Sequence, residues 1–287
     1  MPSFVEVCSA VKRLKNNKAA GPGGVSAEIL KHGSYFLLRR LHRFITAAWT
    51  SGKVPQQWKH ANIINIYKRK RDRAVCGNSR GISLLAVAGK VLARVMLRRL
   101  LIHVAETVLS ESQCGFRRGR STIDMIFIAR LLQEKCREHH RRLYFAFIDL
   151  TKPFDTVNRD LFWKVLAKFD CSSYVLTMLR EFDDGMKSRV VIGGEKSDSF
   201  EVLVGVKQEC VLAPVIFNLL LVAVTLVFRN GLSNDVGIPF KYPLDGSMFN
   251  LRRLQAQTKV CTDTVFELQY ADDAAIPSHE STDLQDN

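Results

Sequence analysis

The sequence lacks closely spaced cysteines. Its seven cysteines stand singly, at positions 8, 76, 114, 136, 171, 210 and 261. No two are close enough in the chain to form the cysteine pair of a zinc module, and no disulfide framework is indicated. The thiols are therefore expected to be reduced, which favours an intracellular protein of the nucleus or cytoplasm. No basic segment followed by an apolar run opens the chain, so a secretory signal is not expected.

Internal repeats and low-complexity tracts are also missing. The chain has 287 residues, of which 47% are hydrophobic. A chain of this length and composition can bury a large core, as one large domain or as two subdomains. General disorder is thereby excluded.

Acidic residues are scarce in the first half of the chain. Residues 1–148 contain 28 Lys and Arg against 8 Asp and Glu, whereas residues 149–287 contain 14 against 20. The first half therefore carries a formal charge of +20 and the second half −6. This asymmetry predicts that the first half holds a polyanion, with nucleic acid favoured over an anionic membrane, and that the second half holds an acidic, metal-binding site.

Long apolar runs are rare, and one of them could be either a membrane span or a buried core helix. Residues 211–228 are nearly long enough to span a membrane, but the run contains Pro214, Asn218 and Thr225. We interpret it as a core helix that is apolar all round, so no membrane partner is expected. Elsewhere, periodicity predicts helices at residues 26–50 and 84–109, whereas residues 230–262 are predicted to be polar and irregular.

Three acids stand in apolar surroundings. Residues 143–150 predict a strand covered on both faces, with Asp149 near its end. Residues 268–276, LQYADDAAI, predict a tight hairpin with Asp272 and Asp273 at its bend. Carboxylates about 4 Å apart repel by about 4 kcal/mol per pair at an effective dielectric near 20, so their convergence favours divalent cations. Ordinary surface acids are the alternative.

The motifs around these acids follow one another as FIDLTKPFDTVNR, then GVKQECVLAPVIFN, then LQYADDAAI. Together they resemble the palm motifs of reverse transcriptases of non-LTR (LINE-like) retrotransposons. The resemblance continues upstream through GNSRGISLLAVAGKVLARVMLRRL and ESQCGFRRGRSTIDMIFIARLLQEKCRE, and it covers nearly the whole chain. It implies an RNA-directed DNA polymerase with an α+β right-hand fold. The basic N-terminal extension and fingers would occupy residues 1–142, and the palm residues 143–287.

The resemblance also assigns partners and roles. RNA template, DNA primer and deoxynucleoside triphosphates are the implied partners, and no obligate protein partner is indicated. The catalytic acids, which would also ligate two Mg²⁺ ions with Mn²⁺ as the alternative, are Asp149, Asp272 and Asp273. The implied nucleotide-binding residues are Arg80, Lys68, Phe154 and Gln208, with Phe154 beneath the sugar. A core aromatic is the alternative for Phe154.

Two basic segments predict contacts with nucleic acid. The first follows a strand predicted at residues 61–67, and its alternative is a solvated loop or a nuclear-import signal. The second precedes a helix that Ser121 and Asp124 are expected to cap with a capping box, and its alternative is solvated basic surface. The residues assigned to nucleic acid are Arg69, Lys70, Arg71, Arg117, Arg118 and Arg120.

The sequence departs from the family at two positions of the implied nucleotide pocket. Pro153 stands where alanine is usual and has no N–H to offer a phosphate. Glu209 stands where glycine is usual and adds bulk and negative charge. The chain is also expected to lack a thumb after the acid pair and an endonuclease upstream. A catalytically silent nucleic-acid-binding remnant is therefore the alternative function.

Overall fold

The computed structural model describes residues 1–69, 72–102, 108–117, 119–206, 210–231, 237–243 and 260–280. The chain divides into two compact units, each made of two segments. Unit 1 comprises residues 1–108 and 152–220, and unit 2 comprises residues 109–151 and 221–287. The predicted boundary between fingers and palm, at residues 142 and 143, does not coincide with this division. It concerns functional subdomains and stays a prediction.

Unit 1 begins with four helices, α1 (Phe4–Lys12), α2 (Ala27–Lys31), α3 (Tyr35–Ser51) and α4 (Gln56–Lys59). The periodic segment at residues 26–50 is two helices rather than one. Ser34 starts the second helix, because its side chain accepts a hydrogen bond from the N–H of Leu37. A side chain on Gly33 would also meet Leu37 and the carbonyl oxygen of Ile29.

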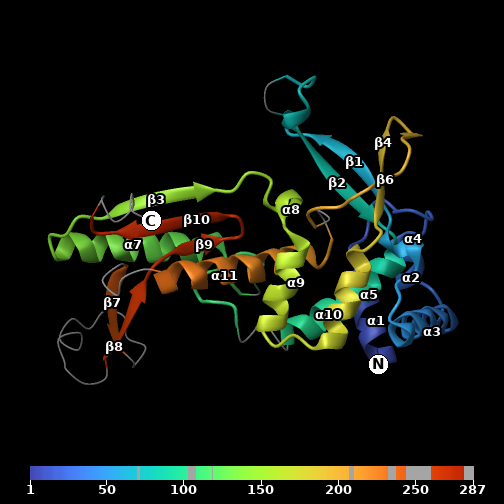
Figure 1. Ribbon diagram of the computed structural model, residues 1–287, viewed down its shortest axis with the longest axis horizontal. Helices are drawn as coiled ribbons and strands as arrows, with labels where there is room; N and C mark the ends of the chain where they lie inside the picture. Colours follow the sequence, from blue (N-terminus) through green and yellow to red (C-terminus); the bar gives the residue numbers. More distant parts are fainter. Residues whose placement is uncertain are drawn as a thin grey trace. The chain divides into compact units, whose positions relative to one another are not determined.

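The sheet of unit 1 is centred on β1 (Ala61–Tyr67). It pairs antiparallel with β2 (Ser79–Leu85) and parallel with β4 (Lys187–Ile192), as Figure 1 shows. The short strands β5 (Glu195–Lys196) and β6 (Phe200–Glu201) both pair with β4. A 3-10 turn, η1 (Cys76–Asn78), lies within the β1–β2 connection. The strand expected at residues 61–67 is therefore present with those bounds.

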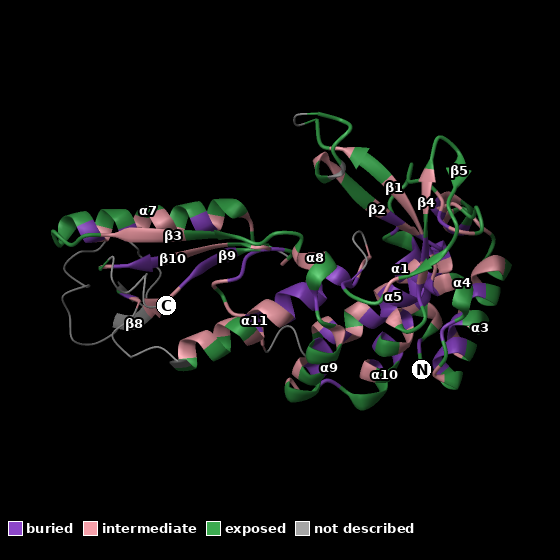
Figure 2. Cartoon of the chain, turned by 45° about the horizontal axis from the view of Figure 1, so that its top comes forward, coloured by how far each residue is buried: buried purple, intermediate pink, exposed green. Residues whose placement is uncertain are grey.

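The core of unit 1 lies among α5 (Val87–Leu100), α9 (Arg159–Lys168), α10 (Ser173–Asp183) and the first part of α11 (Ala213–Gly231). Helix α5 is shorter than predicted, since residues 84 and 85 belong to β2. The Arg99 side chain on α5 forms an ion pair with Glu6 at 3.1 Å. Fully buried members of this core are Val91, Leu92, Met96, Phe162, Leu166 and Met178. Figure 2 shows the buried parts of these helices in purple.

Unit 2 contains a three-stranded sheet in the order β3-β10-β9. Its strands are β3 (Tyr144–Asp149), β9 (Leu268–Tyr270) and β10 (Asp273–Ser278), and both pairings are antiparallel. Helix α7 (Thr122–Glu138) begins with the predicted capping box of Ser121 and Asp124. A separate pair of strands, β7 (Ile238–Pro243) and β8 (Val260–Val265), is antiparallel. The prediction that residues 230–262 are irregular is therefore wrong for residues 238–243 and 260–262, which form strands although polar residues surround them, and for residues 230–231, which end α11. The rest of that prediction, at residues 232–236 and 244–259, lies outside the described residues.

Strand β3 lies at the edge of this sheet in the described part of the chain, and the prediction that both its faces are covered is wrong, because side chains on both faces are exposed. Phe147 is 81% exposed and Ile148 41% exposed. The α7 side of the sheet has small clusters around Met125 and Leu132, and Phe145 packs against both. The apolar composition of β3 reflects contacts at one end of the strand, not burial along its length.

Helix α11 changes character along its length. Val215, Phe217 and Leu219 are buried in unit 1, whereas Val224 and Val227 in unit 2 are 56% and 74% exposed. The prediction of a helix buried all round holds for its first half only. By length and composition alone residues 213–230 could also cross a membrane, a property shared by core helices of soluble proteins.

Candidate active site

Unit 2 places the three predicted acids at one end of its sheet. Asp149 on β3 is the direct register partner of Asp273 on β10. Residues opposite each other in antiparallel strands point to the same face, so these two side chains are neighbours. Tyr270 also pairs with Asp273, which leaves Ala271 and Asp272 as the two-residue turn between β9 and β10. The hairpin predicted at residues 268–276 is thus present, with Asp272 on its turn.

The electrostatics of this end of the sheet favour a cation. Burial, followed by the nearby charges of Asp272 and Asp149, raises the pKa of Asp273 above its ordinary value. Within the described part of the chain, no three His, Cys, Asp or Glu side chains form a ready-made set of metal ligands. The donor chemistry nevertheless fits a hard divalent ion, since carboxylate oxygens are the ligands that Mg²⁺ prefers.

The turn that carries Asp272 has an unusual backbone. Ala271 has a φ of 58°, in the left-handed region that non-glycine residues seldom adopt, and it is only 5% exposed. Both backbone groups of Ala271 are bonded to the side chain of Gln113: the N–H donates to Oε1 at 3.0 Å, and Nε2 donates to the carbonyl at 3.3 Å. Sequence reasoning assigned no role to Gln113. Its only signal was its place in the ESQCGF motif.

Three further interactions hold β9, the strand before this turn, and Glu267, the residue before β9. Gln269 donates from Nε2 to the Thr225 hydroxyl of α11 at 2.9 Å. Glu267 is 3% exposed, accepts a hydrogen bond from Ser112 at 2.7 Å and forms an ion pair with Arg229 of α11. The acid-bearing hairpin is therefore tied both to the segment before α7 and to α11.

The predicted nucleotide-binding residues that the structure describes lie in unit 1. Arg80 is exposed on β2, opposite Ile66 of β1. Lys68 follows β1, and its Nζ donates to the carbonyl of Gly77 at 3.3 Å. Gln208 and Glu209 lie outside the described residues, so nothing is added to their predicted roles.

The start of the FDTV motif is held against the GVKQ motif within unit 1. Helix α8 (Pro153–Thr156) begins with Pro153 at its first turn. The Phe154 ring packs against Phe217 of α11, with centroids 5.1 Å apart, and its carbonyl accepts from the N–H of Val206 at 2.8 Å. At Gly205 the φ is +79°, and a Cβ there would lie 2.6 Å from the Asp155 carbonyl oxygen. Glycine is therefore required for this close approach.

The basic segments differ in how strongly their side chains are engaged. Arg69 is exposed, with a φ of 56°. Arg117 donates to the Ser110 carbonyl at 2.6 Å, and both Arg117 and Arg120 form ion pairs with Glu111. Nucleic acid would have to compete with that carboxylate. Lys70, Arg71 and Arg118 lie outside the described residues.

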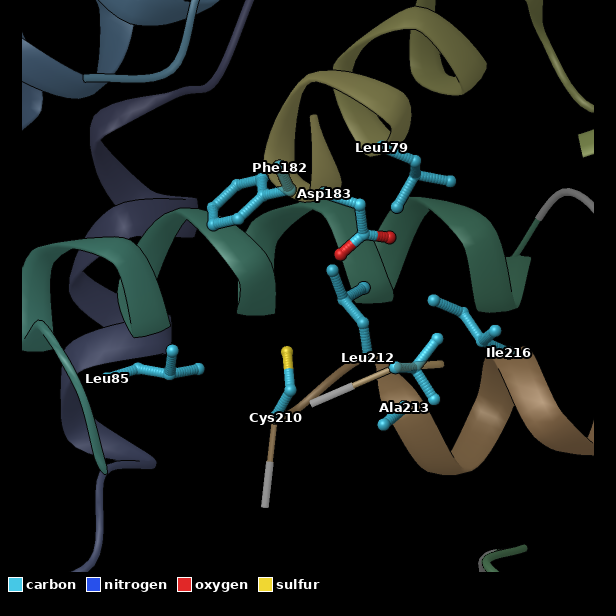
Figure 3. Close-up of a pocket in the computed structure, with 9 residues that line it drawn as sticks. Leu85, Leu179, Phe182, Asp183, Cys210, Leu212, Ala213 and Ile216 are labelled. Atoms are coloured by element: carbon cyan, nitrogen blue, oxygen red, sulfur yellow. The ribbon is translucent and has the colours of Figure 1, made fainter. Parts of the chain in front are cut away.

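The small cavity shown in Figure 3 is not a nucleotide site. It lies in unit 1 at the start of α11, among Leu85, Phe182, Leu212 and Ile216. Its volume of about 20 Å³ is close to that of one water molecule. The cavity is too small to hold a nucleotide.

This fold, with acidic residues at the ends of two paired strands, is consistent with the family that the sequence matches. The chain belongs to the reverse transcriptase family: residues 66–287 match the family described as reverse transcriptase (RNA-dependent DNA polymerase). Enzymes of this family use divalent metal ions. The metal dependence expected from the acids is thus a property of the family.

Its relatives are proteins of non-LTR, LINE-like elements, which confirms the resemblance seen in the motifs. The chain is 25% identical over 238 residues to the transposon TX1 uncharacterized 149 kDa protein of Xenopus laevis, covering 83% of this chain and 18% of the relative. It is 26% identical over 215 residues to the RNA-directed DNA polymerase from mobile element jockey of Drosophila melanogaster, covering 74% and 23%. The chain thus spans about a fifth of the length of these relatives.

A solved structure supports the fold assignment. The chain is similar to a telomerase from Candida tropicalis, solved in complex with a TWJ fragment of telomeric RNA, with a TM-score of 0.50. The match covers 88% of this chain and 41% of the telomerase, at 13% sequence identity. At this identity the likeness concerns the fold alone.

Proposed function

We propose that this chain is the fingers and palm part of an RNA-directed DNA polymerase that copies an RNA template onto a DNA primer. The observation that carries the proposal is the register of Asp149 against Asp273, with Asp272 on the adjoining turn, in a chain of the reverse transcriptase family. Phosphoryl transfer needs positioning and charge neutralisation at one place, and three carboxylates at one sheet end supply ligands for it.

The acids have distinct roles in this proposal. Asp149 and Asp272 would hold two Mg²⁺ ions, with Asp273 assisting. When bound, the ions would supply a lower pKa for the primer 3′-hydroxyl and neutralisation of the leaving pyrophosphate. The raised pKa of Asp273 supports the assignment. It means that the negative charge of Asp273 is unfavourable beside Asp272 and Asp149, and a bound cation would offset this unfavourable energy.

The nucleotide contacts in this proposal come from Arg80, Lys68 and Phe154. The Arg80 guanidinium on β2 binds the triphosphate through its planar fork, with Lys68 as a second cation. Phe154 lies beneath the sugar and excludes a 2′-hydroxyl. Its packing on Phe217 supports this role, because a ring held in place by a neighbouring aromatic cannot move aside for a 2′-hydroxyl.

The test is primer extension on an RNA template with Mg²⁺, comparing the unmodified chain with Asp272→Asn. The unmodified chain should add deoxynucleotides, and the substitution should abolish addition while leaving primer–template binding intact. Binding without extension by the unmodified chain, even when a thumb segment from a relative is fused to it, would instead establish the nucleic-acid-binding remnant.

A further inference from the structure

The side chain of Gln113 is the most completely buried polar group near the acids. It is 0% exposed, and it lies just before the loop that leads to α7. An amide side chain offers two donor hydrogens and one acceptor oxygen, and burying it is costly unless these are bonded. Gln113 has a partner for each of them.

Two of the four hydrogen bonds of Gln113 go to Ala271, the residue before Asp272, and the other two go to Gly115 and Gln269. Oε1 accepts from the N–H of Gly115 at 2.7 Å and of Ala271 at 3.0 Å. Nε2 donates to the carbonyl of Ala271 and to Oε1 of Gln269, both at 3.3 Å. One side chain thus binds the peptide groups on both sides of the Ala271 Cα, which fixes the direction in which the chain enters Asp272.

The backbone around Gln113 is built for this contact. The N–H of Cys114 donates to the Gln269 carbonyl at 2.9 Å, and the N–H of Gln269 donates to the Ser112 carbonyl at 2.8 Å. The segment therefore pairs with β9 through an isolated parallel bridge between Gln113 and Gln269. A Cβ on Gly115 would lie 2.1 Å from the Ala271 nitrogen, so the two backbones meet only because Gly115 has no side chain.

Resting on the proposed function, we infer that Gln113 is a positioning residue, which holds Ala271 in its left-handed conformation and so places Asp272 for metal binding beside Asp149. Left-handed alanine is unfavourable by itself and persists only where its surroundings determine it. Without the amide of Gln113, the turn relaxes and Asp272 moves away from Asp149. The residue acts through the turn and touches no substrate.

The experiment compares Gln113→Met, which has a similar volume and no amide, with Gln57→Met on the exposed surface of α4 as the control. Mn²⁺ affinity is measured by electron paramagnetic resonance, and the rate of single-nucleotide addition is measured against Mg²⁺ concentration. Gln113→Met should weaken Mn²⁺ binding at least threefold, slow addition at least tenfold and raise the Mg²⁺ midpoint. Primer–template affinity should stay within twofold of the unmodified chain.

A folded Gln113→Met protein with unchanged Mn²⁺ affinity and unchanged Mg²⁺ midpoint would overturn the inference. If that variant does not fold, Gln113→Asn takes its place, because it keeps an amide that is one methylene too short to reach Ala271. The Mn²⁺ measurement needs no catalysis. Failure of the proposed polymerase function, seen as no extension by the unmodified chain, is therefore separate from failure of the positioning role.

A second, independent observation concerns three arginines at the far end of the same sheet. Arg130 and Arg137 on α7 and Arg141 just after it line a groove of about 570 Å³ together with Phe145 of β3. All three arginines are exposed. Among the described residues none of these guanidinium groups has an ion-pair or hydrogen-bond partner, unlike Lys135, which pairs with Glu138.

We propose that this groove binds the phosphate backbone of the primer–template. Phe145 lies four residues from Asp149 along β3, or about 13 Å at 3.3 Å per residue. That is roughly four steps of 3.4 Å along one strand of a duplex, so one nucleic acid can reach both places. The planar guanidinium group of arginine can donate two hydrogen bonds to the oxygens of one phosphate. Glu134 is the only acidic residue that lines the groove, so little negative charge opposes a phosphate there.

The test replaces Arg130, Arg137 and Arg141 by Gln and measures the affinity for an RNA–DNA duplex across salt concentrations. The affinity should fall at least tenfold, and the slope of log affinity against log salt should flatten by about 2 to 3. Lys164→Gln with Lys168→Gln on α9 is the control. An unchanged slope, or loss of binding to polyglutamate without loss of duplex binding, overturns the proposal. Because binding is measured without nucleotides, the result does not depend on whether the chain polymerises.

Discussion

The β9–β10 and β1–β2 hairpins of this protein differ in how their charged side chains are held. The β9–β10 hairpin carries short acidic side chains on a backbone held by buried groups, with Gln113 and Glu267 at 0% and 3% exposure. The β1–β2 hairpin carries long cationic side chains, and its outer residues Ile66 and Arg80 are exposed. The acidic hairpin is fixed through its backbone, whereas the described cationic side chains of the basic hairpin, Lys68, Arg69 and Arg80, are exposed.

The difference follows from side-chain length. An aspartate has one methylene between backbone and carboxylate, so its reach is set almost entirely by where the chain runs. Lysine and arginine carry three or four methylenes and can meet a phosphate from several backbone positions. Acids that must share an ion therefore need a rigid turn, while cations that bind a polyanion do not.

The largest effect is expected from Asp149→Asn. Loss of one of the two proposed principal metal ligands should slow nucleotide addition about 1,000-fold, equivalent to about 4 kcal/mol of transition-state stabilisation. Primer–template affinity should remain within twofold, as measured by filter binding. Asp160→Asn, on the exposed start of α9, is the matched control and should extend primers normally. Comparable activity of the two variants would contradict the assignment of the acids.

The next effect separates the two hairpins by their backbones. Gly115→Ala should destabilise the protein by about 1 to 3 kcal/mol, since its Cβ would collide with the Ala271 backbone. Gly77→Ala in the β1–β2 connection should change stability by less than about 0.5 kcal/mol, because nothing lies within 4 Å of its Cβ. Urea unfolding measures both. Equal destabilisation by the two substitutions would mean that the acidic hairpin is no more tightly fixed than the basic one.

A smaller effect is expected from the charges of the basic connection. Replacing Lys68, Arg69, Lys70 and Arg71 by Gln should weaken RNA binding about tenfold at moderate salt. The slope of log affinity against log salt should flatten by about 3, since each phosphate neutralised contributes about 0.7 to 0.9. Lys164→Gln with Lys168→Gln tests for a non-specific effect of net charge. An unaltered slope removes this connection from the binding surface.

The smallest effect is a pH-dependent change in stability at Asp273. A carboxyl whose pKa is raised in the folded protein destabilises that protein at pH values above the raised pKa, where the group is charged. Without divalent ions, Asp273→Asn should therefore raise stability at neutral pH, by less than about 1 kcal/mol because the site is exposed. The gain should vanish below about pH 3.9, the ordinary aspartate value, where the carboxyl is protonated in both states. Thermal unfolding between pH 3 and 8 measures this, and a gain that persists at pH 3 would show that ionisation of Asp273 is not its cause.

The sequence by itself determined the elements whose signals are local. The capping box of α7, the strand β1 and the hairpin around Asp272 and Asp273 were all predictable, because caps, β-branched runs and two-residue turns depend on nearest neighbours in the chain. The amino-acid sequences of the motifs likewise identified the reverse transcriptase family, which residues 66–287 match.

Only the tertiary structure decided what depends on distant segments. It made β3 an exposed edge strand, divided α11 between two units and paired β7 with β8. It also brought Gln113 to Ala271, which is 158 residues away in the chain. A glutamine between serine and cysteine has no pattern that reveals its partners. Its role arises because a buried amide must satisfy its donors and acceptor wherever the fold places it, and in this protein the fold places it under the turn that carries Asp272.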